Sequence, residues 1–150
     1  LIADMTAFYK SKGKTLIDVL EDMFKEFGYF ENKTVTFSFE GASGLEKMAS
    51  LMEQLRSEPP KTVAGADIIE ISDYKLSVTK NEQGEMPILL PKSNVLAYKL
   101  SDGCSFVVRP SGTEPKLKVY ISIVCKTEAE SKTLVESLKD AVSKILDEVE

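Results

Sequence analysis

The sequence has no histidine and no tryptophan among its 150 residues, and it has only two cysteines. Without histidine, the chain can form neither a Ser-His or Cys-His catalytic pair nor a histidine-ligated metal site. Cys104 and Cys125 are too few for a disulfide framework or a zinc site, and both lie in apolar, strand-like surroundings. We therefore expect two buried free thiols in a reducing cytosol.

Long apolar runs are also missing. No stretch approaches the roughly 18 apolar residues of a membrane-spanning helix, and there is no signal-peptide pattern, so we expect a cytoplasmic protein without membrane contact. The net charge of −5 argues against a nucleic-acid surface but leaves room for a local basic pocket. A hydrophobic content of 43% and a charged content of 29% are typical of a globular chain with a core of its own.

Residues 1–28 have the apolar spacing of two helices. The first helix has one apolar face and no capping residue before it; that face consists of Leu1, Ile2, Met5, Phe8 and Tyr9. Thr15 is predicted to cap the second helix, with Asp18 at the capping-box position and Gly28 at the end. We interpret this segment as the helical tail of a preceding domain or a linker, and the chain as a fragment of a longer protein.

Residues 29–150 are predicted to form a second unit that folds independently. Alternation of apolar and polar residues indicates strands at 34–39, 68–72, 95–100, 105–109 and 117–125. The long polar segment from Tyr74 to Asn94 is predicted to be a surface loop that contains a short hairpin. Every alternating strand has one apolar and one more polar face. We therefore predict an α+β fold in β-α-β-β-β-β-α order, with a largely antiparallel sheet, both helices on one face and the other face open.

Both helices of this unit have capping signals and an apolar stripe. Ser43 with Glu46, and Thr127 with Glu130, fit the capping-box spacing. The predicted buried stripes are Leu45, Met48, Ala49, Met52 and Leu55 in the first helix, and Leu134, Leu138, Ala141, Val142, Ile145 and Val149 in the second.

The stretch "VVRPSGTEPKLKVY", residues 107–120, places an unusual set of polar groups between two apolar strands. The alternation predicts that Arg109 and Lys118 leave the two ends of one turn on the open face of the sheet. Between them, Gly112 allows a positive φ that would let backbone N–H groups converge on an anion. The hydroxyls of Ser111 and Thr113 add donors, and the guanidinium matches two phosphate oxygens. A plain β-turn also accounts for Pro, Ser, Gly and Thr, but not for the two cations on one face.

The segment "RPSGTEPKLKVY" resembles the phosphate-binding loop in the C-terminal domain of the α-D-phosphohexomutases, the phosphoglucomutase and phosphomannomutase superfamily. The similarity extends over residues 91–120 and to the order of strands and helices. It is strongest to the longer bacterial members of the superfamily and covers essentially the whole chain, with residues 1–28 similar to the end of the third domain.

The resemblance implies a four-domain enzyme that interconverts hexose 1-phosphate and hexose 6-phosphate through a hexose 1,6-bisphosphate. In that family a phosphoserine in the first domain exchanges its phosphoryl group with the sugar, and an aspartate-rich loop in the second holds Mg²⁺. The fourth domain, whose fold is similar to that of the TATA-binding protein, binds the phosphate that does not react. Carried over to this sequence, the expected phosphate-binding residues are Arg109, Ser111, Gly112 and Thr113, with Lys118 where some members have a basic residue.

The catalytic and metal-binding parts of that family are not found in this sequence. There is no phosphoserine loop or aspartate-rich loop, so we expect no catalytic residue, no metal ligand, no bound cofactor and no mutase activity from these residues alone. The segment "EGASG", residues 40–44, resembles the sugar-recognition loop of the family, but its place before a helix favours a structural role. The acidic residues Asp67, Glu70, Asp73 and Asp102 lack metal-ligand spacing and are interpreted as solvated or turn residues.

Three functional classes follow from these patterns. The first is the phosphate-binding domain of a phosphohexomutase, whose partners are a hexose phosphate and the upstream domains of the same chain. The alternative is a stand-alone module that binds a phosphorylated ligand without catalysis. A nucleic-acid binder is suggested only by the similarity of fold, and the acidic composition disfavours it.

Overall fold

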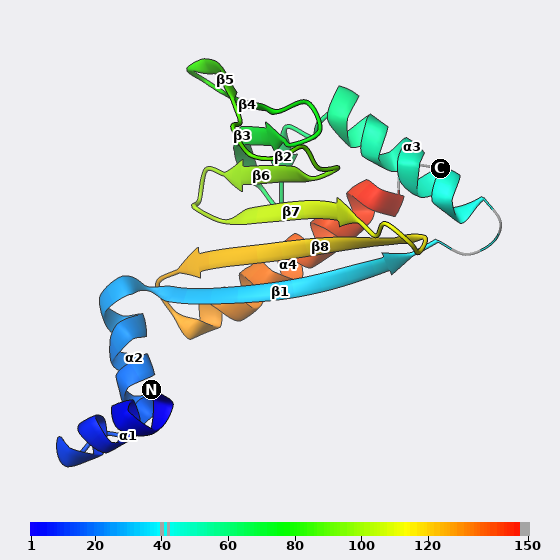
Figure 1. Cartoon of the computed structure of the whole chain (residues 1–150). Coiled ribbons are helices and arrows are strands. Elements are labelled where there is room, and N and C mark those ends of the chain that lie inside the picture. Colours follow the sequence, from blue (N-terminus) through cyan, green and yellow to red (C-terminus); the bar gives the residue numbers. More distant parts are fainter. Residues whose placement is uncertain (40, 42, 148–150) are drawn as a thin grey trace.

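The computed structural model describes residues 1–39, 41 and 43–147 (Figure 1). It begins with two helices, α1 (Ile2–Ser11) and α2 (Leu16–Phe27), neither of which buries a residue. The predicted capping box of α2 is confirmed, because Asp18 N–H donates to Thr15 Oγ1 at 3.1 Å and Thr15 N–H donates to Asp18 Oδ2 at 2.7 Å. The apolar side chains of both helices are largely exposed, with Ile2 at 73% and Phe27 at 62%.

An eight-stranded sheet follows, in which every pair of neighbouring strands is antiparallel. Its strands are β1 (Tyr29–Ser38), β2 (Thr62–Val63), β3 (Ala66–Asp73), β4 (Val78–Asn81), β5 (Gly84–Pro87), β6 (Leu96–Leu100), β7 (Ser105–Pro110) and β8 (Lys116–Cys125). The spatial order is β1-β8-β7-β6-β3-β4-β5, with β2 paired to β3. The predicted α+β class with a largely antiparallel sheet is therefore confirmed. Strands β4 and β5 form the hairpin predicted between Tyr74 and Asn94, whereas β2 was not predicted.

Helices α3 (Gly44–Ser57) and α4 (Glu128–Asp147) pack against the sheet (Figure 1). Their apolar side chains join alternate residues of β6, β7 and β8 in one core, so both helices serve the same face, as predicted. The most deeply buried of its large side chains include Tyr98, Leu51, Met52, Leu96, Leu100, Leu117, Ile121, Ile123 and Leu138. In Figure 1 the helices α1 and α2 lie at the opposite end of β1 from the β7–β8 turn.

The predicted helix stripes are only partly right. In α3, Leu51 is buried, whereas Leu45 is 54% exposed and Ala49 is also exposed. A stripe with Leu45 and Ala49 and a stripe with Leu51 both recur at helical spacing. Tertiary contacts therefore decide which of these residues are buried. In α4, Leu138 and Val142 are buried as predicted, together with Val135 and Leu146; Leu134, Ala141 and Ile145 are half-buried, and Val149 lies outside the described residues.

The two predicted helix caps also differ in outcome. At α4, Glu130 N–H donates to Thr127 Oγ1 at 3.2 Å, as predicted. At α3, Ser43 makes no side-chain capping hydrogen bond, so the capping box with Glu46 is wrong. Ser43 has φ −88° and ψ 1°, which differs from the extended backbone that a capping serine adopts.

Candidate functional site

Strands β7 and β8 form the hairpin that carries the predicted site. Arg109 and Lys118 are cross-strand partners, and both side chains are exposed, while Val108 and Val119 beside them are buried. Alternation therefore places both cations on the face that the helices do not cover, as predicted. Neither cation forms an ion pair with any residue in the described part of the chain. Two positive charges that no described residue neutralises thus stand side by side at the base of the turn.

Backbone hydrogen bonds hold the turn after Arg109 in place. Ser111 N–H donates to the Lys116 carbonyl oxygen at 2.7 Å, and Phe39 N–H donates to the Pro115 carbonyl oxygen at 2.9 Å, which ties the turn to the end of β1. Within the described residues, the N–H groups of Gly112 and Thr113 form no hydrogen bond, and both residues are exposed. These two N–H groups are therefore available to an external acceptor.

The predicted positive φ at Gly112 is wrong, because φ at this residue lies outside the left-handed region. A two-residue hairpin turn would require positive φ, but the loop closed by Ser111 and Lys116 is longer and does not. The amide of Ser111 is also engaged within the turn, so the predicted convergence of N–H groups is reduced. Apart from its two neighbours in the chain, a Cβ added at Gly112 would meet no atom of the described residues within 4 Å, which leaves that space open to a ligand.

A cleft of about 560 Å³ lies beside the turn. Arg109, Pro110, Ser111 and Gly112 form one wall; the others are Met48, Ala49 and Met52 from α3, and Ser93, Asn94 and Val95 before β6. Of the predicted site residues, Arg109, Ser111 and Gly112 line the cleft, whereas Thr113 and Lys118 do not. Sequence reasoning missed the walls from α3 and from 93–95, and no local signal marked them.

Helix α3 begins close against the turn. A Cβ added at Gly44 would lie 2.4 Å from the Phe39 carbonyl oxygen and 3.1 Å from Pro115 Cβ. Only glycine fits there, so this residue has a packing role, in keeping with the structural role expected for 40–44. Glu40 and Ala42 of that segment lie outside the described residues. Through this contact the first turn of α3 fixes the position of the cleft wall.

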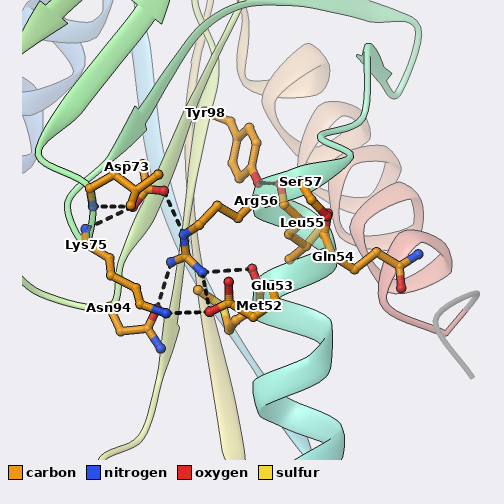
Figure 2. A network of polar contacts seen from close by, with 11 residues as sticks. Met52, Glu53, Gln54, Leu55, Arg56, Ser57, Asp73, Lys75, Asn94 and Tyr98 are labelled. Atoms are coloured by element: carbon orange, nitrogen blue, oxygen red, sulfur yellow. Dashed lines mark hydrogen bonds and ion pairs between the residues drawn. The ribbon is translucent and has the colours of Figure 1, made fainter.

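Arg56, near the end of α3, lies at the centre of a polar network (Figure 2). Arg56 Nε donates to Asp73 Oδ2 at 2.7 Å, and the two side chains are only 9% and 7% exposed. Arg56 Nη1 donates to the Met52 carbonyl oxygen and to Glu53 Oε1, and Nη2 donates to Asn94 Oδ1 at 2.9 Å. The network thus joins α3, the end of β3 and the segment before β6.

Further contacts extend this network. Asp73 Oδ1 accepts the N–H groups of Lys75 and Leu76, so this residue is a turn residue, as predicted, but it is not solvated. A hydrogen bond from Lys75 lowers the pKa of Glu53, which favours its charged form. Tyr98 donates its hydroxyl to the Leu55 carbonyl oxygen at 3.1 Å, and burial raises the pKa of this phenol.

The remaining acidic residues do not gather into a metal site. No group of three His, Cys, Asp or Glu side chains in the described ranges could hold a metal ion. Asp102 instead accepts the Cys104 N–H at 2.9 Å, and Glu70 accepts Asn81 Nδ2 at 3.2 Å. The acidic residues in the described ranges therefore do not fit a Mg²⁺ site, and the family resemblance places that ion in a different domain.

The two cysteines are free, but they differ in burial. Cys104 is fully buried, as predicted, and burial raises the pKa of its thiol. Cys125 is only half-buried, and its thiol donates to the Thr127 carbonyl oxygen at 3.2 Å, so the prediction of burial holds for Cys104 alone. Within the part of the chain that the structure describes, no helix is long and apolar enough to cross a bilayer.

The fold and the site define an α+β domain in which an antiparallel sheet, covered by helices on one face, carries a basic turn beside an open cleft. Residues 58–145 match the family described as phosphoglucomutase/phosphomannomutase, C-terminal domain, and the chain belongs to this family. The resemblance found in the turn sequence is thereby confirmed.

Similar proteins include phosphoglucomutases of two staphylococci. The phosphoglucomutase of Staphylococcus haemolyticus (strain JCSC1435) is 38% identical over 125 residues, which are 82% of this chain and 23% of that protein. The phosphoglucomutase of Staphylococcus epidermidis (strain ATCC 12228 / FDA PCI 1200) is 37% identical over 127 residues, 83% of this chain and 23% of that protein. This chain therefore spans less than a quarter of the length of these relatives.

A crystal structure of pp63/parafusin, a phosphoglucomutase from Paramecium in its open form, has a similar fold. Its TM-score is 0.52 at 16% sequence identity, and the match covers 93% of this chain and 24% of that one. At this identity the likeness confirms the fold.

Proposed function

We propose that this chain is the C-terminal domain of a cytoplasmic phosphohexomutase, in which it binds the phosphate group of the substrate that is not being transferred. The enzyme would interconvert hexose 1-phosphate and hexose 6-phosphate. The observation that carries the proposal is the pairing of Arg109 with Lys118 across β7 and β8. Both cations are exposed and have no ion-pair partner among the described residues, and Arg109 also lines the cleft beside the turn. Membership of the phosphoglucomutase/phosphomannomutase family supports the same reading.

Each group at the turn has a chemical role in this proposal. The Arg109 guanidinium can bind two phosphate oxygens with its planar fork, and Lys118 adds a point charge. The Gly112 and Thr113 N–H groups and the Ser111 and Thr113 hydroxyls supply neutral donors. The open space at Gly112 lets the phosphate approach the backbone.

Binding the remote phosphate supplies orientation and binding energy that the reacting end of the substrate can use. A hexose 1,6-bisphosphate must also turn round between two transfers, so one clamp has to hold either of its phosphates. Recognition by charge suits this requirement better than recognition of sugar hydroxyls. In this proposal the phosphoserine, the Mg²⁺ ligands and the sugar-recognition residues belong to other domains, and the chain alone has no mutase activity.

The test is a titration of the ¹⁵N-labelled chain with inorganic phosphate and with glucose 1-phosphate, followed by NMR. We expect weak, saturable binding, on the order of millimolar, because one domain supplies only part of a cleft. The shifts should concentrate at the amides of Gly112 and Thr113, since the Ser111 N–H is donated to Lys116. Affinity should fall with added salt, and below about pH 6, where a phosphate monoester loses its second charge.

Variants distinguish specific phosphate binding by Arg109 from a general effect of the net charge. Arg109→Lys keeps the charge but loses the fork, so we expect weaker binding, and Arg109→Gln should weaken it further. Lys144→Gln on α4 is the matched control: it removes one exposed charge on the helix-covered face and should leave binding unchanged. Absence of saturable binding by the unaltered chain, or shifts confined to residues 74–92, would overturn the proposal.

A further inference from the structure

Asn94 stands on the wall of the cleft contributed by the segment before β6, while Arg109 to Gly112 form another. Within the described residues its side chain makes one hydrogen bond, which Oδ1 accepts from Arg56 Nη2 at 2.9 Å. The residue is exposed and lines the cleft, so its second polar end has room for a further hydrogen-bond partner. Asn94 is therefore anchored at one end and available at the other.

The hydrogen bond from Arg56 determines which atom of the Asn94 amide faces the guanidinium and which faces away. A guanidinium can only donate hydrogen bonds, so the amide oxygen of Asn94 must face it, and the amide nitrogen must face away. Figure 2 shows Asn94 Nδ2 turned away from the guanidinium. The two N–H bonds of this nitrogen are thus presented by a fixed amide and not by a freely flipping one.

The orientation of Arg56 is itself secured. Its Nε is paired with the buried carboxylate of Asp73, whose other oxygen accepts two backbone N–H groups. Its Nη1 is held by the Met52 carbonyl oxygen and by Glu53. Because these three partners fix Nε and Nη1, the remaining nitrogen, Nη2, stays in one position, and so does the Asn94 amide oxygen that accepts from it.

We propose that Asn94 Nδ2 donates a hydrogen bond to an oxygen of the anion held by the Arg109–Gly112 turn, and that Arg56 is the positioning residue that makes this possible. The inference deepens the proposed function and rests on it. It assigns the cleft a donor that faces the basic turn from a different segment of the chain, so the anion is bound from two sides.

An isosteric substitution separates the ligand role from the structural one. Asn94→Asp keeps an oxygen for Arg56 Nη2, so the fold and its unfolding midpoint should change little, but it replaces the donor toward the cleft by a charged acceptor. We expect affinity for inorganic phosphate to fall at least about fivefold. Gln54→Glu is the matched control, because it makes the same chemical change at an exposed residue of α3. Figure 2 shows Gln54 on the far side of that helix from Asn94, and we expect an effect below about twofold.

The side-chain amide resonances give a direct readout. On titration of the unaltered chain with inorganic phosphate, the Asn94 NH₂ signals should shift with the same dissociation constant as the Gly112 amide. The NH₂ signals of Asn81, whose nitrogen donates to Glu70, should stay in place.

The outcomes distinguish the two proposals. If the unaltered chain does not bind phosphate, the proposed function fails. If it binds, and Arg109→Gln abolishes binding while Asn94→Asp binds like the unaltered chain, only the role of Asn94 is overturned. Equal losses in Asn94→Asp and Gln54→Glu would also overturn it, because they would show a long-range charge effect.

Discussion

Replacing Arg56 by methionine tests the buried ion pair that organises the end of α3. Methionine fills similar space without the charge, so the variant leaves the Asp73 carboxylate, 7% exposed, with two backbone N–H groups as its remaining partners. Removing one member of a buried pair costs about 3–5 kcal/mol, because the other charge stays buried without compensation. A domain of this size has a total stability of about 5–15 kcal/mol, so the loss should be a large fraction of it.

The measurement is urea unfolding followed by far-UV circular dichroism, since the chain has no tryptophan to report by fluorescence. Adding Asp73→Asn to Arg56→Met removes the stranded charge and keeps an oxygen for the Lys75 and Leu76 N–H groups, so the double variant should recover a large part of the loss. A cost below about 1 kcal/mol for Arg56→Met, which is the range of an exposed pair, would refute the reasoning. So would a double variant that is less stable than Arg56→Met alone.

Two glycines, one at the start of α3 and one within the turn, should respond to substitution in opposite ways. Gly44→Ala should destabilise the chain by about 1–3 kcal/mol, because the new Cβ would lie 2.4 Å from the Phe39 carbonyl oxygen; an unchanged urea midpoint would contradict this. Gly112→Ala should leave stability unchanged or slightly raised, because φ is not in the left-handed region and the new Cβ would contact none of the described residues beyond its chain neighbours. It should nevertheless weaken phosphate binding several-fold in the NMR titration. A stability loss of about 1–2 kcal/mol at this residue would instead indicate a positive φ.

The sequence sufficed to predict which way the strand residues of the site face. In β7 and β8 the side chains alternate with period two, so the burial of Val108 and Val119 places Arg109 and Lys118 on the other face without further information. The antiparallel sheet followed from the same alternation. These predictions succeeded because the geometry of a strand is local.

The rest of the cleft depends on contacts between distant segments. Arg56, Asp73 and Asn94 meet because α3, β3 and the segment before β6 converge, and nothing in the residues around each of them indicates a partner. The α3 stripe was partly wrong for a related reason. Met48, Met52 and Leu55 are buried as predicted, but tertiary packing buries Leu51 in place of Leu45 and Ala49. The positive φ predicted for Gly112 failed because the length of the closed loop, and not the residue type, decides the backbone of a turn.

The pairing of β1 with β8 has a consequence for the synthesis of the protein. Each strand is ten residues long, and residues 39–115 separate them. At ribosomal rates of about 5–20 residues per second, β1 waits roughly 4–15 s for its partner. During that interval Val35 and Phe37 are in water, although both pack against the core in the finished fold. The backbone of β1 is also unpaired, and exposed strand edges of this kind are what chaperones protect. The turn that carries Arg109 is completed by the same strand, β8, so the site can form only after β8 has been made and has paired with β7.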